Sequence, residues 1–350
     1  MDKFELLEKL TNAHGVSGSE FSMGKAVTDA LGSLSDTVNI DRLGNIIAHK
    51  KGTSNGKVKI MLAAHVDEIG FMVKYIEDNG FLRFTSIGGI DPRTSIGQEV
   101  TIHGNEDILG VIGSKPPHLQ DAKEQNKAIK LEDMIIDTGF TKEQLEGKVS
   151  LGDTITVKRK TERLLNERVT GKAMDNRSGV VTLYEVLKEL QDMKHYADVY
   201  AVATVLEEET MSGAHTSTYA IDPDLGIAVD VGFGRTPELS VYESIELGKG
   251  PGLAIGGNIH PGLRKRLTET ADKYGIPYQT DVAPGPTGTD ARAMQITRDG
   301  IPTLLVSIPL RYMHTSVETL DLRDIHHSAR LIAHFINSIK EDEMEGLLCF

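Results

Sequence analysis

Apolar residues recur at helical spacing at the start of the chain and again through most of its second half. The apolar positions from Phe4 to Leu10 predict one helix, and those through Val27 and Leu31 predict a second. Further helices are predicted at about residues 176–193, from about 212, at 262–274 and at 321–339. Short apolar or β-branched runs predict strands at residues 38–41, 45–49, 57–65, 198–206, 225–231 and 302–308. This alternation is typical of a three-layer α/β/α domain.

The pattern changes between about Ile69 and Leu164. The runs FMVKYI and FLRFTSI flank Asp78-Asn79-Gly80, which is the signature of a β-hairpin. Further strands are predicted at residues 98–103, 108–112 and 154–157, with only short helical stretches near residues 132 and 141–146. We therefore predict a discontinuous α/β catalytic domain, residues 1–68 and 165–350, which is interrupted by a β-rich domain at residues 69–164.

The charge balance limits the partners of the chain. Its 350 residues include 38 Lys and Arg against 51 Asp and Glu, for a net charge of −13. Such an acidic chain lacks the basic surface that neutralises nucleic-acid phosphates, and anionic membranes would repel it. The start, MDKFELLEKL, has no apolar signal segment, and no run of eighteen apolar residues follows. We expect a cytoplasmic protein with neither nucleic-acid nor membrane partners.

The cysteine content limits the metal chemistry. Cys349 is the single cysteine of the chain. This excludes a disulfide framework, an iron–sulfur cluster and a thiolate zinc site. Any metal ion must therefore be bound by histidines and carboxylates.

Five strand-like segments end in a histidine or a carboxylate. These endings are His65 to Asp67, Asp175 after Ala173-Met174, Glu207 to Glu209, Asp230, and His314 after the strand at 303–308. The carboxyl ends of parallel strands meet at one edge of a sheet, so these side chains are expected to lie close together. Any one of them alone is typical of a turn or a helix cap. As a set without thiolates, they suit Zn²⁺, Co²⁺ or Mn²⁺, and their number favours two ions that share a carboxylate.

Two of these endings leave alternatives open. Asp67 is placed to accept a hydrogen bond from the ring of His65, or it is a solvated acid. The adjacent glutamates Glu207 and Glu208 can supply one metal ligand and one general base, or they form the solvated first turn of a helix. The spacing does not divide the two roles between them.

Six motifs in order carry a resemblance to a known family. They are AAHVDEIGFMV, GKAMDNRSG, ATVLEEE, AVDVG, GPTGTDA and PLRYMHTSVE, spread from residue 63 to residue 318. The chain resembles the TET-type dinuclear metallo-aminopeptidases, family forty-two of the metallopeptidases. This family includes leucyl, glutamyl and lysyl aminopeptidases and proteins labelled cellulase M.

The resemblance implies two divalent metal ions that share the carboxylate of Asp175, and a cis peptide bond after that residue. It implies Glu207 as the general base and Asp67 as the partner that orients His65. The β-rich insertion would be a dimerisation domain, and dimers would build a tetrahedral dodecamer. The implied ligands are His65, Asp175 and Asp230 for one ion, and Asp175, Glu208 and His314 for the other.

The chain departs from the family pattern beside the candidate base. Leu206 stands where the family usually has Gln, and residues 209–212 also differ. The extra carboxylate of Glu209 either points to solvent or disfavours acidic substrate side chains by repulsion. Asp290 is a candidate for the substrate pocket or a helix cap, and Arg311 is a candidate for contact with an oxyanion or a substrate carboxylate.

We therefore expect a metal-dependent aminopeptidase, with two Zn²⁺ or Co²⁺ ions per subunit and Mn²⁺ as a further possibility, that acts on peptides with a free N-terminus. A glycoside hydrolase of the endo-1,4-β-glucanase type is the first alternative. It accounts for the carboxylates but leaves His65 and His314 without a role. A non-catalytic metal-binding assembly protein is the second alternative, motivated by the departure after Glu208. The pattern does not encode the preferred N-terminal residue.

Overall fold

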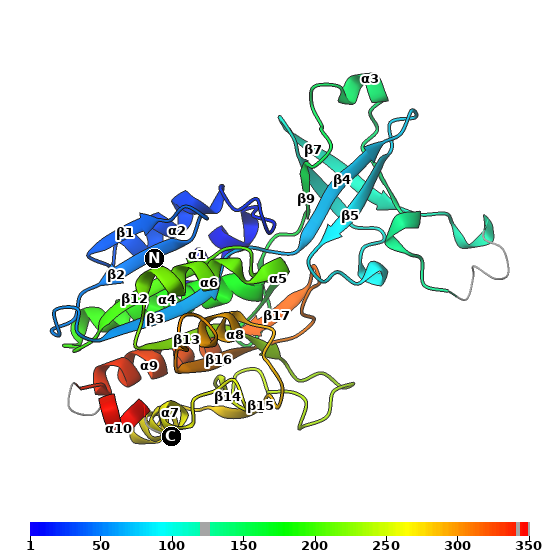
Figure 1. The fold of residues 1–350 in the computed structure, drawn as a ribbon. Coiled ribbons are helices and arrows are strands. Elements are labelled where there is room, and N and C mark those ends of the chain that lie inside the picture. Colours follow the sequence, from blue (N-terminus) through cyan, green and yellow to red (C-terminus); the bar gives the residue numbers. More distant parts are fainter. Residues whose placement is uncertain (120–126, 341–343, 349–350) are drawn as a thin grey trace.

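The computed structural model describes residues 1–119, 127–340 and 344–348, so Cys349 lies outside the described residues. An α/β body contains the first helix, α1 (Lys3–Asn12), and the last, α10 (Met344–Leu348). A β-barrel projects from this body at the upper right of Figure 1. The chain thus has two differently built parts.

An eight-stranded sheet, counted over the described residues, forms the centre of the α/β body. Its order is β1-β2-β12-β3-β13-β16-β14-β15, and the neighbours from β12 to β16 are parallel. These central strands are almost entirely buried, as continuous apolar runs such as KIMLAAH in β3 require. The strands are β1 (Thr37–Ile40), β2 (Ile46–Lys50), β3 (Lys59–His65), β12 (Asp198–Thr204), β13 (Leu225–Phe233), β14 (Gly252–Ile255), β15 (Gln279–Val282) and β16 (Thr303–Leu310).

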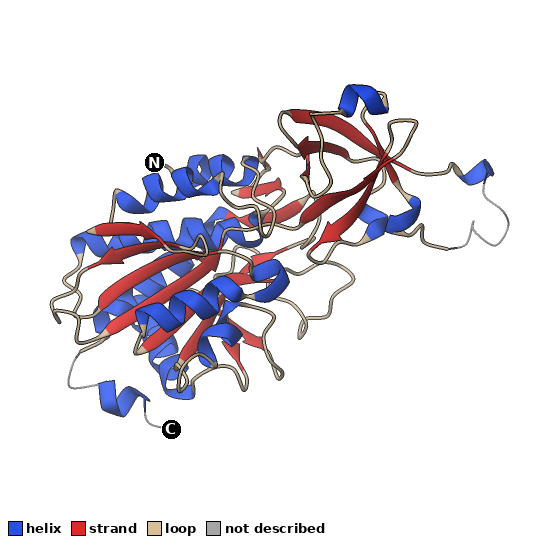
Figure 2. Cartoon of the chain, turned by 45° about the horizontal axis from the view of Figure 1, so that its top comes forward, coloured by secondary structure: helices blue, strands red, loops and turns tan. Residues whose placement is uncertain are grey.

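Helices cover both faces of the sheet and give the body three layers (Figure 2). The long helices α4 (Met174–Glu189) and α9 (Leu322–Ser338) pack against each other and contact the sheet, and α1 packs on α4. Buried residues of α9 recur every three or four positions, as an amphipathic helix on a sheet requires. The other helices of this body are α2 (Met23–Gly32), α5 (Glu207–Thr210), α6 (Ser212–Ile221), α7 (Pro261–Tyr274), α8 (Asp290–Gln295) and the 3₁₀ turn η4 (Leu190–Asp192).

The barrel closes in the order β4-β5-β8-β7-β6-β9. Its strands alternate between the two faces: in β7, Ile108 and Ile112 are buried in the barrel core, whereas Leu109 and Val111 are exposed. The barrel strands are β4 (Gly70–Ile76), β5 (Leu82–Ile87), β6 (Glu99–His103), β7 (Asp107–Gly113), β8 (Ile135–Asp137) and β9 (Thr154–Val157). Short helices accompany them: η1 (Pro92–Thr94), η2 (Pro117–Leu119), η3 (Leu131–Asp133) and α3 (Lys142–Leu145).

A small three-stranded sheet lies where the chain returns from the barrel to the α/β body. Its order is β10-β11-β17, and both pairs are antiparallel. The strands are β10 (Glu162–Arg163), β11 (Arg168–Gly171) and β17 (Glu318–Asp321). This sheet brings Glu318 next to the start of α4.

The predicted fold class, a three-layer α/β/α domain with a β-rich insertion, is confirmed, and the predicted hairpin is β4–β5. The boundaries at residues 69 and 164 stay a prediction. The interpretation of Ala173-Met174 as a strand end is wrong, because β11 ends at Gly171 and Met174 begins α4. The carboxylate of Glu318 accepts hydrogen bonds from the N–H groups of Met174 and Asp175, and thereby satisfies donors that a helix start leaves free.

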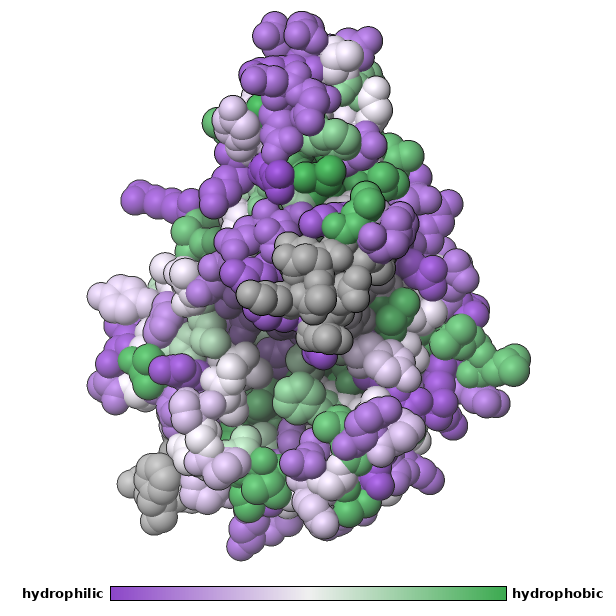
Figure 3. Space-filling view, turned by 90° about the vertical axis from the view of Figure 1, so that its right-hand side faces the viewer, coloured by the Kyte–Doolittle hydropathy of each residue, from purple (hydrophilic) through white to green (hydrophobic). Residues whose placement is uncertain are grey.

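Among residues 1–119, 127–340 and 344–348, no helix combines the length and the apolar character needed to cross a bilayer. The face seen from the barrel side carries many hydrophilic residues with smaller hydrophobic groups among them (Figure 3).

Candidate metal centre

Two groups of candidate ligands meet at the carboxyl edge of the central sheet. His65 is the last residue of β3, and Asp230 lies in the carboxyl half of β13. Asp175 lies at the start of α4, where the backbone angles of Asp175 and Asn176 are not helical. Glu208 lies in α5 after β12, and His314 follows β16. The side chains reach this edge from five segments that are far apart in the sequence, as expected for a site on an open α/β sheet.

Asp175 belongs to both groups. Ligand atoms of His65, Asp175 and Asp230 all lie within 4.8 Å of one another, and so do those of Asp175, Glu208 and His314. The Oδ1 atom of Asp175 lies 3.1 Å from Nε2 of His65, and its Oδ2 atom lies 3.3 Å from Nε2 of His314. Each carboxylate oxygen thus faces a different histidine. The peptide bond between Asp175 and Asn176 is cis.

Asp67 contacts both His65 and the paired glutamates. The Nδ1 atom of His65 lies 3.5 Å from a carboxylate oxygen of Asp67 and 3.2 Å from its backbone oxygen. Both oxygens are acceptors here, so Nδ1 carries a proton, and Nε2 is the ring nitrogen that faces Asp175 and is left to bind a metal ion. The Asp67 carboxylate also accepts hydrogen bonds from the N–H groups of Glu207 and Glu208, at 3.1 Å each. Asp67 is therefore buried and engaged rather than solvated.

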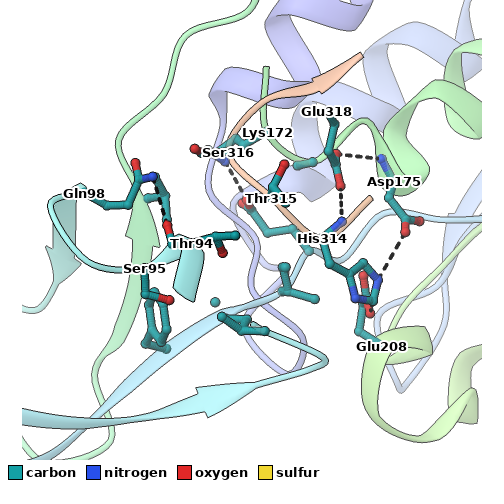
Figure 4. Close-up of a pocket in the computed structure, with 17 residues that line it drawn as sticks. Thr94, Ser95, Gln98, Lys172, Asp175, Glu208, His314, Thr315, Ser316 and Glu318 are labelled. Carbon is teal, nitrogen blue, oxygen red and sulfur yellow. Dashed lines mark hydrogen bonds and ion pairs between the residues drawn. The ribbon is translucent and has the colours of Figure 1, made fainter. Parts of the chain in front are cut away.

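The second histidine is oriented in the same way by other groups. Nδ1 of His314 donates to the backbone oxygen of Gly89 at 2.8 Å, which leaves Nε2 facing Asp175 and Glu208. The N–H of His314 donates to Glu318 at 2.9 Å. Figure 4 shows Glu318 between the backbones of Asp175 and His314, with the imidazole directed away from it toward Asp175 and Glu208. Glu318 thus fixes two candidate ligands at once.

The three consecutive glutamates have different surroundings. Glu207 is buried, and its Oε1 atom has no hydrogen-bond partner among the described residues. Oε2 of Glu208 lies 3.4 Å from Nε2 of His314. Glu209 accepts a hydrogen bond at 2.6 Å from the N–H of Gly88, which follows β5 of the barrel. Glu209 is an exposed residue, so its carboxylate bonds to the barrel at a solvent-accessible position, and its predicted effect on acidic substrates stays a prediction.

The electrostatics of the cluster are dominated by buried carboxylates. Burial, reinforced by Asp230, raises the pKa of Glu207 to about 10. Burial and the neighbouring Asp175 raise the pKa of Glu208 to about 8. The hydrogen bond to Asp175 raises the pKa of His314 to about 9. Burial opposes ionisation of Asp175, but hydrogen bonds with His314 and His65 lower its pKa.

This donor set fits divalent metal ions. Carboxylate oxygens and imidazole nitrogens are ligands for Zn²⁺, Co²⁺ and Mn²⁺. The two groups that share Asp175 leave acceptor capacity that cations would use, and the unpartnered Oε1 atom of buried Glu207 lies beside them. Cations also favour the ionised forms of carboxylates whose pKa values are raised by burial and mutual repulsion.

An open cavity of about 640 Å³ lies over the cluster. Beyond the candidate ligands, its lining includes Thr210, Met211, His215, Thr289, Arg292 and Met313. A narrower pocket lies on the barrel side of His314 and is bordered by Thr94, Ser95 and Gln98 (Figure 4). The ligand cluster therefore lies between two spaces, and the larger has room for the end of a peptide.

Asp290 and Arg311, the two predicted substrate-binding residues, are not among the described residues that line the larger cavity. Asp290 is buried and accepts a hydrogen bond from Thr204 at 2.5 Å, while Thr289 is the N-cap of α8. Burial raises the pKa of Asp290 to about 6. Arg311 donates from Nε to the backbone oxygen of Arg235 at 2.6 Å. Their predicted contacts with substrate gain no support from this geometry.

Sequence reasoning did not single out Glu318, Arg292 or Met211. Glu318 ends a motif that was recognised, but its function follows from three backbone N–H groups that only the folded chain brings to it. Arg292 lies in α8 and Met211 lies between α5 and α6, and both line the cavity beside recognised residues. Their nearness to the motifs was the one available signal.

A family model, a curated relative and solved structures show which family the chain is similar to. The family model described as M42 glutamyl aminopeptidase matches residues 44–331. The lysyl aminopeptidase of Pyrococcus furiosus is 40% identical over 345 residues, which cover 97% of this chain and 98% of that protein. An aminopeptidase structure from the archaeon Desulfurococcus kamchatkensis is 36% identical with a TM-score of 0.92, and the match covers 99% of this chain and 98% of that one. The TET1 peptidase of Pyrococcus horikoshii, described as assembling into a tetrahedron or a large octahedral shell, is 32% identical with a TM-score of 0.85, covering 97% of this chain and 100% of that one.

Proposed function

The chain belongs to the M42 glutamyl aminopeptidase family, and from this membership we propose that it binds two divalent metal ions and uses Glu207 as its general base. The protein is an aminopeptidase, a hydrolase of peptide bonds, and its family implies divalent metal ions. The number and identity of the ions and the division of roles among the residues are the proposal.

One observation carries this proposal: the two carboxylate oxygens of Asp175 face two different histidines, each within a separate group of candidate ligands. A shared carboxylate between two such groups supports a pair of ions rather than one. His65 and Asp230 would complete one site, and Glu208 and His314 the other. The nitrogen and oxygen donors favour Zn²⁺ or Co²⁺, and Mn²⁺ also fits.

Such ions, when bound, polarise the scissile carbonyl and lower the pKa of water. Glu207 lines the cavity and has a free acceptor atom, so it is placed to take a proton from the attacking water and return it to the leaving amine. Asp67 holds the N–H groups of both glutamates and orients His65. Because the free α-amine of a peptide is cationic, a cavity bounded by carboxylates suits it.

We extend the proposal to assembly. The TET1 peptidase of Pyrococcus horikoshii is described as assembling into a tetrahedron or a large octahedral shell, and the barrel of this chain exposes apolar side chains on β7. Leu109 and Val111, on the same side of that strand, are 51% and 46% exposed. Exposed apolar groups favour a partner surface. The barrel, taken as residues 69–164, would form a homodimer, and dimers would build a dodecamer.

Replacement of Glu207 by Gln tests the general base. The protein is depleted of metal, reconstituted with Zn²⁺ or Co²⁺, and assayed on the p-nitroanilides of Leu, Glu and Lys. The Glu207→Gln variant should retain two ions per subunit and lose about 10²–10⁴-fold in kcat, the contribution of a general base. Glu269→Gln, on the exposed side of α7, is the matched control and should behave as wild type.

Three results would count against the proposal. Full turnover by Glu207→Gln would remove Glu207 as the base. Chelator-resistant release of reducing sugar from a cellulose oligomer, without release of amine from the anilides, would favour the glycoside hydrolase. Failure to release amine with both ions bound would favour the non-catalytic assembly protein.

A further inference from the structure

The turn that follows β5 in the barrel bonds to the candidate metal centre at two points. The backbone oxygen of Gly89 accepts a hydrogen bond from Nδ1 of His314 at 2.8 Å. The N–H of Gly88, one residue earlier, donates to Oε1 of Glu209 at 2.6 Å. A single turn of the barrel thus contacts one candidate ligand directly and the residue next to another, Glu208.

The first contact decides how His314 presents its ring. A carbonyl oxygen can only accept, so Nδ1 donates to Gly89, and Nε2 is the nitrogen that remains for a metal ion. Nε2 then faces Asp175 at 3.3 Å and Glu208 at 3.4 Å. A ligating histidine depends on such a bond at its other nitrogen for its tautomer and its orientation.

The second contact restrains the turn that bears Glu208. Helix α5 has only four residues, and it lies between Leu206 and Met211, which both have left-handed backbone angles. So short a helix has few internal hydrogen bonds. From the α/β body, Asp67 holds the N–H groups at its start. From the barrel, Gly88 holds its Glu209 side chain through a hydrogen bond that the carboxylate charge strengthens.

The two glycines allow this close approach. Gly88 has a φ of +75°, and a Cβ atom there would meet Cγ2 of Ile69 at 2.6 Å. A Cβ atom at Gly89 would lie 3.0 Å from Nδ1 of His314. Larger residues would push the turn away from the ligands.

We propose that Glu209 and the Gly88–Gly89 turn form a clamp through which the barrel sets the metal affinity of the group Asp175, Glu208 and His314. The inference rests on the proposed pair of ions. Glu209 is a positioning residue: it binds no ion and takes no part in proton transfer. The clamp makes one of the two ion sites depend on the barrel. Among the described residues, the hydrogen bonds and ion pairs of His65 and Asp230 go to the α/β body.

Metal binding, measured apart from activity, tests the clamp. The full-length protein is dialysed against buffers of graded free Zn²⁺, and bound zinc per subunit is measured. In Glu209→Ala the dissociation constant of the ion bound by Asp175, Glu208 and His314 should rise on the order of 10-fold, which is the lower range for loss of a supporting hydrogen bond. The dissociation constant of the other ion should stay unchanged. Glu209→Gln keeps an acceptor oxygen and should recover most of the affinity, and Glu269→Ala should match wild type.

A second pair of variants tests the barrel side. Gly89→Ala should weaken the same ion and change the visible absorption of the Co²⁺-loaded protein, because its Cβ displaces His314. Gly113→Ala, at a barrel glycine whose Cβ would meet nothing within 4 Å, is the matched control and should change neither. Thermal unfolding of the metal-free control variants Gly113→Ala and Glu269→Ala should stay within about 1 °C of wild type, because substitutions away from packed or hydrogen-bonded positions cost little.

The outcomes separate the two proposals. A wild-type protein that binds fewer than two ions would refute the proposed function and the clamp with it. A wild type with two ions, together with unchanged zinc affinity in Glu209→Ala and Gly89→Ala, would refute the clamp alone. Equal weakening of both ions, or no recovery in Glu209→Gln, would also overturn the clamp.

Discussion

Replacement of Glu68 by Gln perturbs a buried ion-pair cluster directly behind the candidate ligands. The Glu68 carboxylate lies 2.6 Å from Nζ of Lys172 and 3.0 Å from Nη2 of Arg177. The three side chains are 4%, 9% and 0% exposed. Arg177 also donates to the backbone oxygens of Val66, at 3.1 Å, and Leu10, at 2.7 Å. The cluster therefore joins α1 to the segments that carry His65 and Asp175.

Removing one partner of such a pair leaves a buried charge uncompensated, at a cost of about 3–5 kcal/mol. Because Gln keeps the shape of the side chain and one acceptor oxygen, we expect the free energy of unfolding to fall by about 3 kcal/mol, the lower end of this range. The unfolding entropy of about 2.1 cal/mol/K per residue, for 350 residues, converts this into a fall in Tm of about 4 °C. The assay is thermal unfolding of the metal-free protein at pH 7.

The matched control is Asp29→Asn, which removes an exposed ion pair with Lys25 in α2. Its side chains are 54% and 86% exposed, so the expected cost is below about 0.5 kcal/mol. A Tm for Glu68→Gln no lower than that of Asp29→Asn would refute the reasoning.

The pH dependence of this effect has a defined sign. Burial opposes ionisation of Glu68, but the charges of Arg177 and Lys172 outweigh it and hold its pKa below the usual value. Because the pKa of Glu68 is lower in the folded protein than in the unfolded chain, its ionised form stabilises the fold fully above the unfolded pKa of about 4.3. This stabilisation is lost as the pH falls through the pKa of Glu68 in the folded protein. The Tm difference between wild type and Glu68→Gln should therefore shrink below about pH 4.

Two further predictions concern the metal pair and the assembly. Asp175→Asn weakens the shared ligand of both candidate groups, so zinc content and peptidase activity should fall together; a variant that keeps two ions per subunit would contradict a shared carboxylate. Leu109→Glu places a charge on the exposed apolar face of β7, so the particle mass from light scattering should fall toward that of a single subunit. An unchanged mass would show that this face lies outside the interface, and Glu146→Ala, elsewhere on the barrel, is the control.

Strong periodicity made the central layers predictable. The strand around Leu62 and the helix around Ile332 are long, apolar and regular, so local pattern and final burial agree. Strands β14 and β15 were not predicted. They lie toward one edge of the sheet, and the burial of β15 alternates between intermediate and exposed, so its sequence QTDV carries little apolar signal.

The candidate ligands were visible because each follows or ends an apolar run, whereas their supports were not. Glu318 accepts from the backbone of His314, four positions away, and from that of Asp175, 143 positions away, which lies next to it only when β17 pairs with β11. Glu209 bonds to a glycine 121 positions away in the sequence. No local pattern records such a contact, because a carboxylate that accepts from a backbone N–H resembles any other acidic residue in sequence.

The contrast between two neighbouring carboxylates explains why the cluster favours metal ions over mere structural support. Asp67 and Glu68 are adjacent and both buried, but Glu68 faces Lys172 and Arg177, whose charges balance it. On the cavity side, Asp175, Glu207, Glu208 and Asp230 face two histidines and, among the described residues, no lysine or arginine within ion-pair distance. If these carboxylates served only to stabilise the fold, a lysine or an arginine could balance their charge, as Lys172 and Arg177 balance that of Glu68. Burying unbalanced negative charge costs free energy, and bound divalent cations offset that cost. The carboxylates line the open cavity, through which such cations reach them.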